Sequence, residues 1–273
     1  ESEIARAQRE ADPAFLALMR RVIANIRDYQ EHIKLRDPEP LSRGGRKLGV
    51  RYTPIERVGV YVPGGRALYP STVLMTVVPA QVAGVREIVM ASPPTGGRIS
   101  DMALALAGEL GIREVLQLGG AVAVAAMAYG TASIRPVHKV VGPGNAFVAE
   151  AKRQLFGRVG IDSVAGPSEV VVVADDHAPP AWVAADLLAQ AEHDPGAAVL
   201  VTPSLALAEA VAVEVDAQLA RLSRGEAARS SIERYSAAVV TPSLEAACDL
   251  ASEIAAEHLQ IMTSNDAYCV QRI

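Results

Sequence analysis

The sequence predicts an α/β fold with mostly parallel sheets. From residue 56 onward, short runs rich in valine and isoleucine alternate with longer runs rich in alanine and leucine. Three of the strand-like runs end in Ser or Thr followed by Pro, just before a helical run. Strands that alternate with helices form right-handed βαβ units, which set the strands parallel to one another.

The first expected element is a long helix that begins at Asp12 and Pro13. Asp is a favoured N-cap residue, and Pro is favoured at the first helical position. Apolar residues then recur at spacings of three and four: Phe15, Met19, Val22, Ile26, Tyr29 and Ile33. One apolar stripe of this kind predicts a helix packed on a core, with a partner-binding coiled coil as the alternative.

Seven strands are expected farther along the chain, each a short run of β-forming residues. They cover residues 58–61, 88–90, 115–118, 139–141, 169–173, 198–201 and 237–240. Helices are expected at 101–110, at 121–129 and from the region of 176–180 to 194. The similar runs 198–204 and 238–243 fit either generic α/β construction or a tandem pair of similar α/β domains.

Composition narrows the function classes. The length of 273 residues allows one large domain or two ordinary ones, and 50% hydrophobic with 21% charged residues is typical of a folded protein. A net charge of −5 and 4% aromatic residues argue against a nucleic-acid partner. The longest apolar run, 121–129, is too short to span a bilayer, so no membrane partner is expected.

Two cysteines without a CxxC pair fit a reducing compartment, and we expect a cytoplasmic protein. The same pattern argues against a thiolate zinc site or a disulfide scaffold. The N-terminus is acidic, which is not typical of a signal peptide. Because the chain does not begin with Met, we expect a fragment in which both ends are missing.

Glycine-rich loops are expected next to several strands. Loops 61–65, 118–120 and 142–145 follow strands, and loop 165–168 precedes one. In open parallel sheets, ligands bind beyond the carboxyl ends of the strands, and glycine lets a ligand approach the backbone. Loop 142–145 begins like a dinucleotide fingerprint but has Phe147 at the third glycine position, so a tight turn is the alternative.

Two matching Ala-Glu-His triplets contain the histidines of interest. Gln190 and His193 lie three residues apart on one face of a helix, where they suit two positions of a metal site. The alternative is that they cap the last carbonyls of that helix. Glu257 and His258 precede a strand-like run and suit acid and base roles in a cleft, with an exposed surface pair as the alternative.

Five motifs occur in the order and with roughly the spacing of histidinol dehydrogenases. They are 61–65, 142–147, 165–169, 190–195 and 256–259. The chain therefore resembles the histidinol dehydrogenase family from about residue 12 to its end. It looks like a fragment that lacks the family's N-terminal arm and C-terminal region.

The resemblance implies two Rossmann-like α/β domains with a cleft between them. Residues 57–168 would bind NAD, and residues 1–56 together with 169–273 would carry the metal and acid/base residues. It also implies an NAD- and zinc-dependent four-electron oxidation of L-histidinol to L-histidine through the aldehyde, in histidine biosynthesis. The family's enzyme is a homodimer in which the partner subunit completes the site.

Cofactor and metal positions follow from the resemblance. Tyr61 and Asn145 match NAD contacts, and Gln190 and His193 match zinc ligands that also lie next to the substrate. Val122 stands where the family usually has a Gln that touches NAD. A valine cannot donate that hydrogen bond, and its loss is expected to cost about 0.5–1.5 kcal/mol of NAD affinity.

Substrate and catalytic positions follow in the same way. Ser168 matches a substrate contact, His258 matches the base that takes the alcohol proton, and Glu257 matches the residue that activates water. Family members continue past residue 273 and supply an Asp ligand and further His residues there. We therefore expect these 273 residues alone to bind zinc weakly and to turn over little. Two alternatives remain, a family member that oxidises another small alcohol and a non-catalytic nucleotide-binding module.

Overall fold

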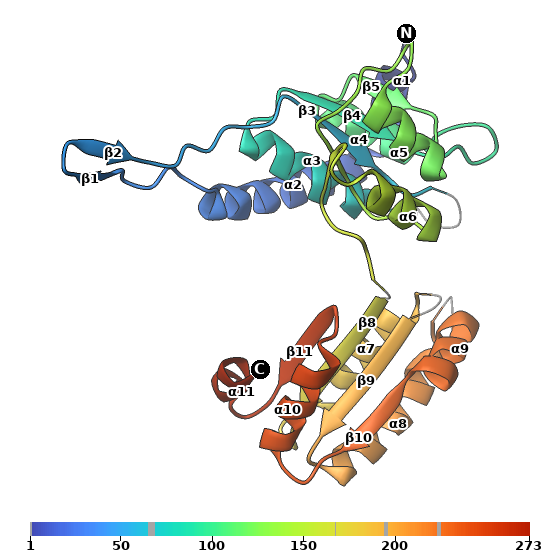
Figure 1. Cartoon of the computed structure of the whole chain (residues 1–273). Helices are drawn as coiled ribbons and strands as arrows, with labels where there is room; N and C mark the ends of the chain where they lie inside the picture. The colour runs from blue at the N-terminus through green and yellow to red at the C-terminus, as the bar shows by residue number, and fades with distance from the viewer. Residues whose placement is uncertain (1, 65–68, 167, 194–195, 223–224) are drawn as a thin grey trace. The chain divides into compact units, whose positions relative to one another are not determined.

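The computed structural model describes residues 2–64, 69–166, 168–193, 196–222 and 225–273 (Figure 1). Gly65, Pro167, Asp194 and Pro195 of the motifs above lie outside these ranges. The chain forms two compact units, Glu1–Ala165 and Gly166–Ile273. Both units are α/β with parallel main sheets, so the predicted fold class is confirmed.

The first unit is built on a five-stranded parallel sheet in the order β5-β4-β3-β6-β7. Its strands are β3 (Arg57–Tyr61), β4 (Glu87–Ala91), β5 (Glu114–Leu116), β6 (Lys139–Val141) and β7 (Gly160–Ile161). The predicted strands match the first four of these. β7 was not predicted, because two residues carry no periodic signal.

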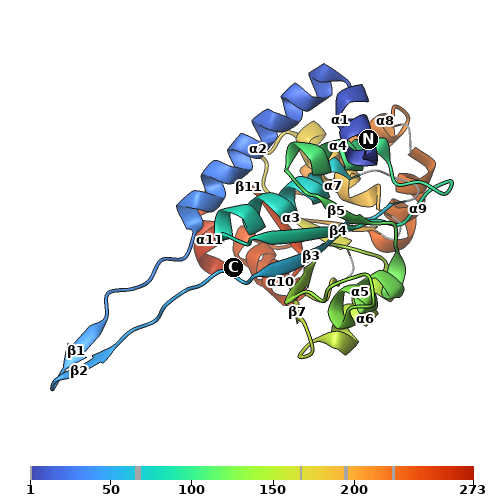
Figure 2. The same ribbon diagram turned by 90° about the horizontal axis from the view of Figure 1, so that it is seen from above.

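Helices cover both faces of this sheet (Figure 2). One face carries α3 (Pro70–Ala83) and α4 (Asp101–Glu109), whose buried residues join Val58, Val60 and Met90 in one cluster. The other face carries α5 (Gly120–Tyr129) and α6 (Ala146–Leu155), which pack on Tyr61 and Val140.

The N-terminal helices α1 (Glu3–Glu10) and α2 (Pro13–Ile33) belong to the first unit. α1 packs on α4 and α2 packs on α3, and Leu16 joins their core. Arg20 Nε donates to Glu109 Oε2 at 2.6 Å. The sequence-based division places residues 1–56 with the second domain, but the contacts of α1 and α2 lie with the first unit. The contact boundary falls after Ala165 rather than after residue 168.

The predicted apolar stripe of the long helix is used along most of its length. Phe15, Met19, Val22 and Ile26 pack against the core, whereas Tyr29 and Ile33 are exposed. After α2 the chain forms an exposed hairpin of β1 (Leu41–Arg43) and β2 (Arg46–Leu48). This hairpin was not predicted, because its strands bury no face and so show no clear alternation of polarity.

The second unit is built on a four-stranded parallel sheet in the order β10-β9-β8-β11. Its strands are β8 (Ser168–Ala174), β9 (Gly196–Thr202), β10 (Ala237–Val240) and β11 (His258–Met262). α7 (Pro180–Ala191), α8 (Leu205–Leu219) and α9 (Gly225–Tyr235) share one hydrophobic cluster with this sheet, and α10 (Leu244–Ile254) packs on its other face. α11 (Asp266–Arg272) follows β11.

Within the described ranges, no helix combines the length and the apolar character needed to cross a bilayer.

Candidate functional site

Tyr61 ends β3 and faces inward. Its side chain is buried in the same cluster as Val124 and Met127 of α5. Its hydroxyl accepts a hydrogen bond from the backbone N–H of Gly120 at 3.0 Å. Tyr61 therefore fixes the first residue of α5 relative to the carboxyl end of β3, and it does not present its ring to solvent.

Asn145 is the N-cap of α6. Its Oδ1 accepts from the backbone N–H groups of Phe147 at 3.1 Å and Val148 at 3.2 Å. This explains why the helix begins here, because a side-chain oxygen at the N-cap satisfies donors that have no partner inside the helix. The side chain is exposed, and within the described part of the chain its amide nitrogen donates to no group. That nitrogen is available to a ligand at the carboxyl edge of the sheet.

Gly142 links Tyr61 and Asn145, because it contacts the Tyr61 carbonyl and lies three residues before Asn145. Its φ of +112° is a conformation that favours glycine, and a Cβ at this position would collide with the carbonyl oxygen of Tyr61. Its N–H donates to Asp162 Oδ2 at 2.7 Å, and its carbonyl accepts from Lys152 Nζ at 3.0 Å. Lys152 and Asp162 also form an ion pair. Both backbone polar groups of Gly142 are thus held by side chains.

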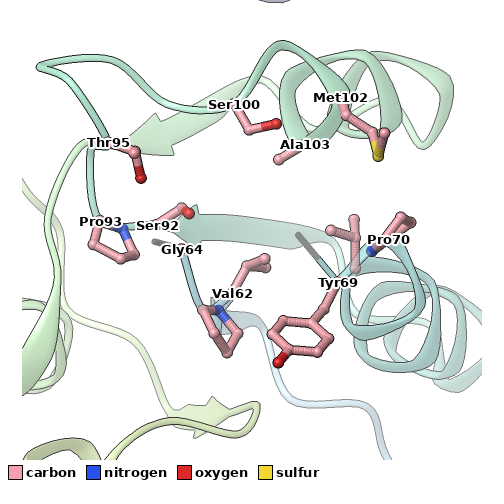
Figure 3. Close-up of a pocket in the computed structure, with 12 residues that line it drawn as sticks. Val62, Gly64, Tyr69, Pro70, Ser92, Pro93, Thr95, Ser100, Met102 and Ala103 are labelled. Carbon is pink, nitrogen blue, oxygen red and sulfur yellow. The ribbon is translucent and has the colours of Figure 1, made fainter. Parts of the chain in front are cut away.

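A small cavity lies at the same edge, between β3, β4, α3 and α4 (Figure 3). Hydroxyl groups and apolar side chains line it together: Val62, Tyr69, Ser92, Thr95, Ser100 and Met102. Its volume of about 20 Å³ suits a single water molecule. The cavity is therefore too small for a nicotinamide or an adenine ring.

The second unit places its candidate residues at the amino edge of its sheet. Ser168 is the first residue of β8 and pairs with Gly196, the first residue of β9. His258 is the first residue of β11 and pairs with Val170. Side chains alternate along a strand, and paired residues of parallel strands share a face. Val170 packs in the α7 cluster, so Ser168 and His258 lie on the α7 face as well.

Gln190 and His193 reach the same edge from the end of α7. The His193 N–H donates to the Gln190 carbonyl at 3.1 Å, and the His193 carbonyl accepts from Ser231 Oγ at 2.9 Å. A Cβ at Gly196 would collide with the Gln190 carbonyl and lie 2.8 Å from the His193 carbonyl, so position 196 requires glycine. Ser231 and Gly196 therefore contact the backbone of the predicted pair.

The side chain of Gln190 is buried, and its Nε2 has no hydrogen-bond partner among the residues that the structure describes. A buried polar group without a partner costs about 1–3 kcal/mol. Packing alone would favour an apolar residue at this position. The unpartnered N–H donor therefore suits a residue that binds a hydrogen-bond acceptor of a ligand.

Glu257 and His258 form an exposed pair where α10 leads into β11. His258 Nε2 lies 3.8 Å from Glu257 Oε2, and both side chains are at least half exposed. Ala255, which ends α10, has φ 50° and ψ 48°, in the left-handed region that is rare for alanine. This turn sends the chain directly from α10 into the Glu257–His258 pair.

The candidate residues lie at the carboxyl edge of the sheet in the first unit and at the amino edge of the sheet in the second. Tyr61 and Asn145 lie where strands end, as expected for an open parallel sheet. Ser168, Gln190 and His258 lie where strands begin, because their turns run from a loop or helix into a strand. The candidate residues of the second unit therefore lie at the edge opposite to the one where open parallel sheets usually bind ligands.

The described residues provide only part of a metal site. Among the described residues, no group of three or more His, Cys, Asp and Glu side chains can hold a metal ion. Gln190 and His193 supply an amide oxygen and an imidazole nitrogen, whereas a catalytic zinc keeps about three protein ligands. The two residues fit zinc as part of a ligand set.

Comparison with known proteins decides the family. The family model for histidinol dehydrogenase matches residues 1–273. The chain belongs to the histidinol dehydrogenase family. A histidinol dehydrogenase of Geobacillus kaustophilus is 52% identical over 97% of this chain and 63% of its own length, and one of Halalkalibacterium halodurans is 52% identical over 96% and 62%.

The fold of a solved histidinol dehydrogenase matches that of this chain. The crystal structure of histidinol dehydrogenase from Elizabethkingia anophelis has a TM-score of 0.94, with 34% identity over 99% of this chain and 63% of that chain. The chain thus spans about three fifths of the length of these histidinol dehydrogenases.

Two residues of this family member were missed by sequence reasoning. Lys152 and Asp162 hold the loop that contains Gly142, but no motif singled them out. One signal was present: Lys152 follows Val148 by four residues and so lies on the buried face of α6. A lysine on an apolar helix face indicates a buried partner.

Proposed function

We propose that the protein is a histidinol dehydrogenase that oxidises L-histidinol through the aldehyde to L-histidine. Each hydride passes to NAD, so one histidinol reduces two NAD molecules. The observation that carries the proposal is the grouping of Ser168, Gln190, His193 and His258 at one sheet edge. The Gln190 Nε2 there is buried and has no partner within the described ranges. Membership of the histidinol dehydrogenase family supports the substrate.

In the first oxidation, His258 takes the proton of the substrate hydroxyl as hydride leaves the carbon. Its exposed imidazole at the start of β11 is accessible to a substrate. In the second step, Glu257 accepts a proton from the water that attacks the aldehyde carbon, and a second hydride leaves. Adjacent acid and base groups suit two consecutive proton removals at one carbon.

Gln190 and His193 would hold zinc, with further ligands from outside these 273 residues. When bound, zinc supplies a positive centre that orients the nitrogen atoms of histidinol. Ser168, on the same face of the sheet, would contact the substrate. The homodimer implied by the family would supply part of the remaining ligand set.

Tyr61 and Asn145 would position NAD at the carboxyl edge of the first unit. Tyr61 fixes the start of α5 through Gly120, and Asn145 offers its amide nitrogen. Val122 in the first turn of α5 is exposed and cannot replace the hydrogen bond of a glutamine. We infer a weaker hold on NAD at this point than a glutamine would give.

The stoichiometry of NADH release tests the proposal in the protein as its gene encodes it. With zinc, NAD and limiting L-histidinol, two NADH molecules per histidinol are expected. One NADH per substrate, or equal rates with other small primary alcohols, would favour a family member that oxidises a different alcohol. No NADH from any alcohol, together with NAD binding, would favour a non-catalytic nucleotide-binding module.

A further inference from the structure

Lys152 is a buried lysine in the last turn of α6. Its side chain is 4% exposed, and it lies on the same helix face as the buried Val148. Removing an ammonium group from water costs several kcal/mol unless it is paired and hydrogen-bonded. An aliphatic residue would pack here without that cost, so the charge needs a reason other than packing.

The polar interactions of the Lys152 ammonium group hold the loop that contains Gly142. It donates to the Gly142 carbonyl at 3.0 Å and pairs with Asp162, at the carboxyl end of β7. The same carboxylate accepts from the Gly142 N–H at 2.7 Å. The ion pair therefore fixes both peptide groups that flank the Gly142 Cα, and with them the direction in which the chain leaves β6.

This direction determines where two proposed cofactor contacts lie. Gly142 rests against the Tyr61 carbonyl with no room for a Cβ, and Asn145 follows three residues later as the N-cap of α6. Lys152, two turns into α6, ties that helix back to the loop that precedes it. A shift of Gly142 would displace Asn145 and the start of α6 relative to Tyr61.

We propose that Lys152 and Asp162 are positioning residues for the dinucleotide, which act by holding the loop 142–145 in its binding conformation. This inference rests on the proposed binding of NAD at this edge. The pair carries no net charge, and the Lys152 ammonium is buried and occupied by the loop. Its effect on NAD is therefore indirect.

Two substitutions test the inference in the protein as its gene encodes it. Lys152→Met keeps a long apolar stem but removes the ammonium, and Asp162→Ala removes the acceptor of the Gly142 N–H. Each should raise the Kd and KM for NAD by roughly 10- to 100-fold, the range that corresponds to a lost charge-assisted hydrogen bond. The KM for histidinol and kcat at saturating NAD should stay within about twofold.

Glu109→Gln is the matched control. Glu109, like Asp162, is a carboxylate in an ion pair of the first unit, but it lies with Arg20 and Gln8 on the opposite face of the sheet. Its loss should lower the melting temperature and leave the Kd for NAD unchanged. Melting curves of all variants show whether each is folded at the assay temperature.

Each outcome separates the possible roles. If Lys152 bound a phosphate directly, Asp162→Ala would free its charge and tighten NAD binding, which would overturn a positioning role. Unchanged NAD affinity in a folded Lys152→Met or Asp162→Ala protein would also overturn it. Failure of the unsubstituted protein to bind NAD would instead overturn the proposed function. If either single variant does not fold, the double variant Lys152→Met/Asp162→Ala decides the question, because it leaves no buried ammonium without a partner.

Discussion

The hydroxyl of Tyr61 accepts a hydrogen bond from the backbone N–H of Gly120 across two loops of the first unit, at 3.0 Å. Tyr61 ends β3, and Gly120 begins α5 with a φ of +63°. The bond joins the loop after the first strand of the sheet to the first residue of a helix 59 positions later. It therefore sets the spacing of the two loops that flank the proposed NAD site.

Replacing Tyr61 by Phe should weaken NAD binding without unfolding the protein. The loss of one neutral hydrogen bond corresponds to about 0.5–1.5 kcal/mol, or roughly a 2- to 12-fold rise in the Kd for NAD. Fluorescence titration with NADH measures it. Tyr129→Phe is the control, because Tyr129 is exposed at the end of α5. Equal affinity in Tyr61→Phe would show that the Gly120 bond does not shape the NAD site.

Substitutions of Glu257 and His258 should separate the two oxidation steps. His258→Gln is expected to lower kcat by roughly 10²- to 10⁴-fold, the usual contribution of a general base. Glu257→Gln should slow the second oxidation more than the first, so that the NADH yield per histidinol falls from two toward one in the early phase. Rapid-quench analysis of the aldehyde checks this. Equal slowing of both steps by Glu257→Gln would contradict its role with water.

Replacing Gln190 by Leu should have opposite effects on stability and on metal binding. The substitution removes a buried amide nitrogen that has no partner in the described part of the chain, which should stabilise the metal-free chain by about 1–3 kcal/mol. It should also abolish any rise in melting temperature on adding zinc. His193→Ala is the matched variant, since its side chain is exposed and its loss should remove the zinc response without the stability gain. A zinc response that survives both substitutions would exclude them as ligands.

The chain of 273 residues by itself should bind zinc weakly and show little histidinol oxidation. Gln190 and His193 provide two donors, fewer than the three protein ligands usual at a catalytic zinc. Isothermal titration with zinc, followed by the NADH assay on the same sample, tests both statements. Tight stoichiometric binding with turnover would mean that these residues complete the site themselves.

Cys248 should make stability fall at alkaline pH. Burial, together with a hydrogen bond and charge interaction with Cys269, raises the pKa of the Cys248 thiol from 9.0 to about 11. Because the folded-state pKa is the higher one, the stabilisation is complete below about pH 9 and is lost as pH rises through about 11. The loss should reach roughly 2–3 kcal/mol by this linkage.

Urea unfolding at several pH values measures this loss. Other groups titrate in the same range, so the relevant quantity is the difference between the unsubstituted chain and Cys248→Ala. A constant difference from pH 7 to pH 11 would contradict the raised pKa. Slow reaction of the thiol with iodoacetamide near pH 8 is the corresponding chemical test, since the thiolate is the reactive form.

Sequence reasoning predicted the positions of the strands better than the division of the chain into two units. Val170–Val173 form a continuous apolar run, and the structure buries them as a central strand between two helical layers. The stripe of α2 indicated a buried face but carried no information about which core it covers. Its contacts with α3 arise from packing between segments about 50 residues apart.

The sequence predicts which residues are candidates but not where they lie. Gln190 and His193 stay candidates on their spacing and motif, whereas the edge of the sheet to which they belong depends on where strands begin. Lys152 and Asp162 were missed because they bind the backbone of Gly142. Every residue type has these backbone groups, so the sequence does not show which residue will be such a partner. Such contacts become visible only once the chain is folded.

The candidate residues of the second unit lie where its strands begin, so substitutions at the opposite edge of that sheet should be tolerated. β8 has seven residues and so separates Ser168 from Ala174 by roughly 20 Å. Loops such as those after Thr202 and Val240 leave their strands on that distant rim. They are therefore suitable attachment points for a fluorescent label or an affinity tag that must not disturb catalysis.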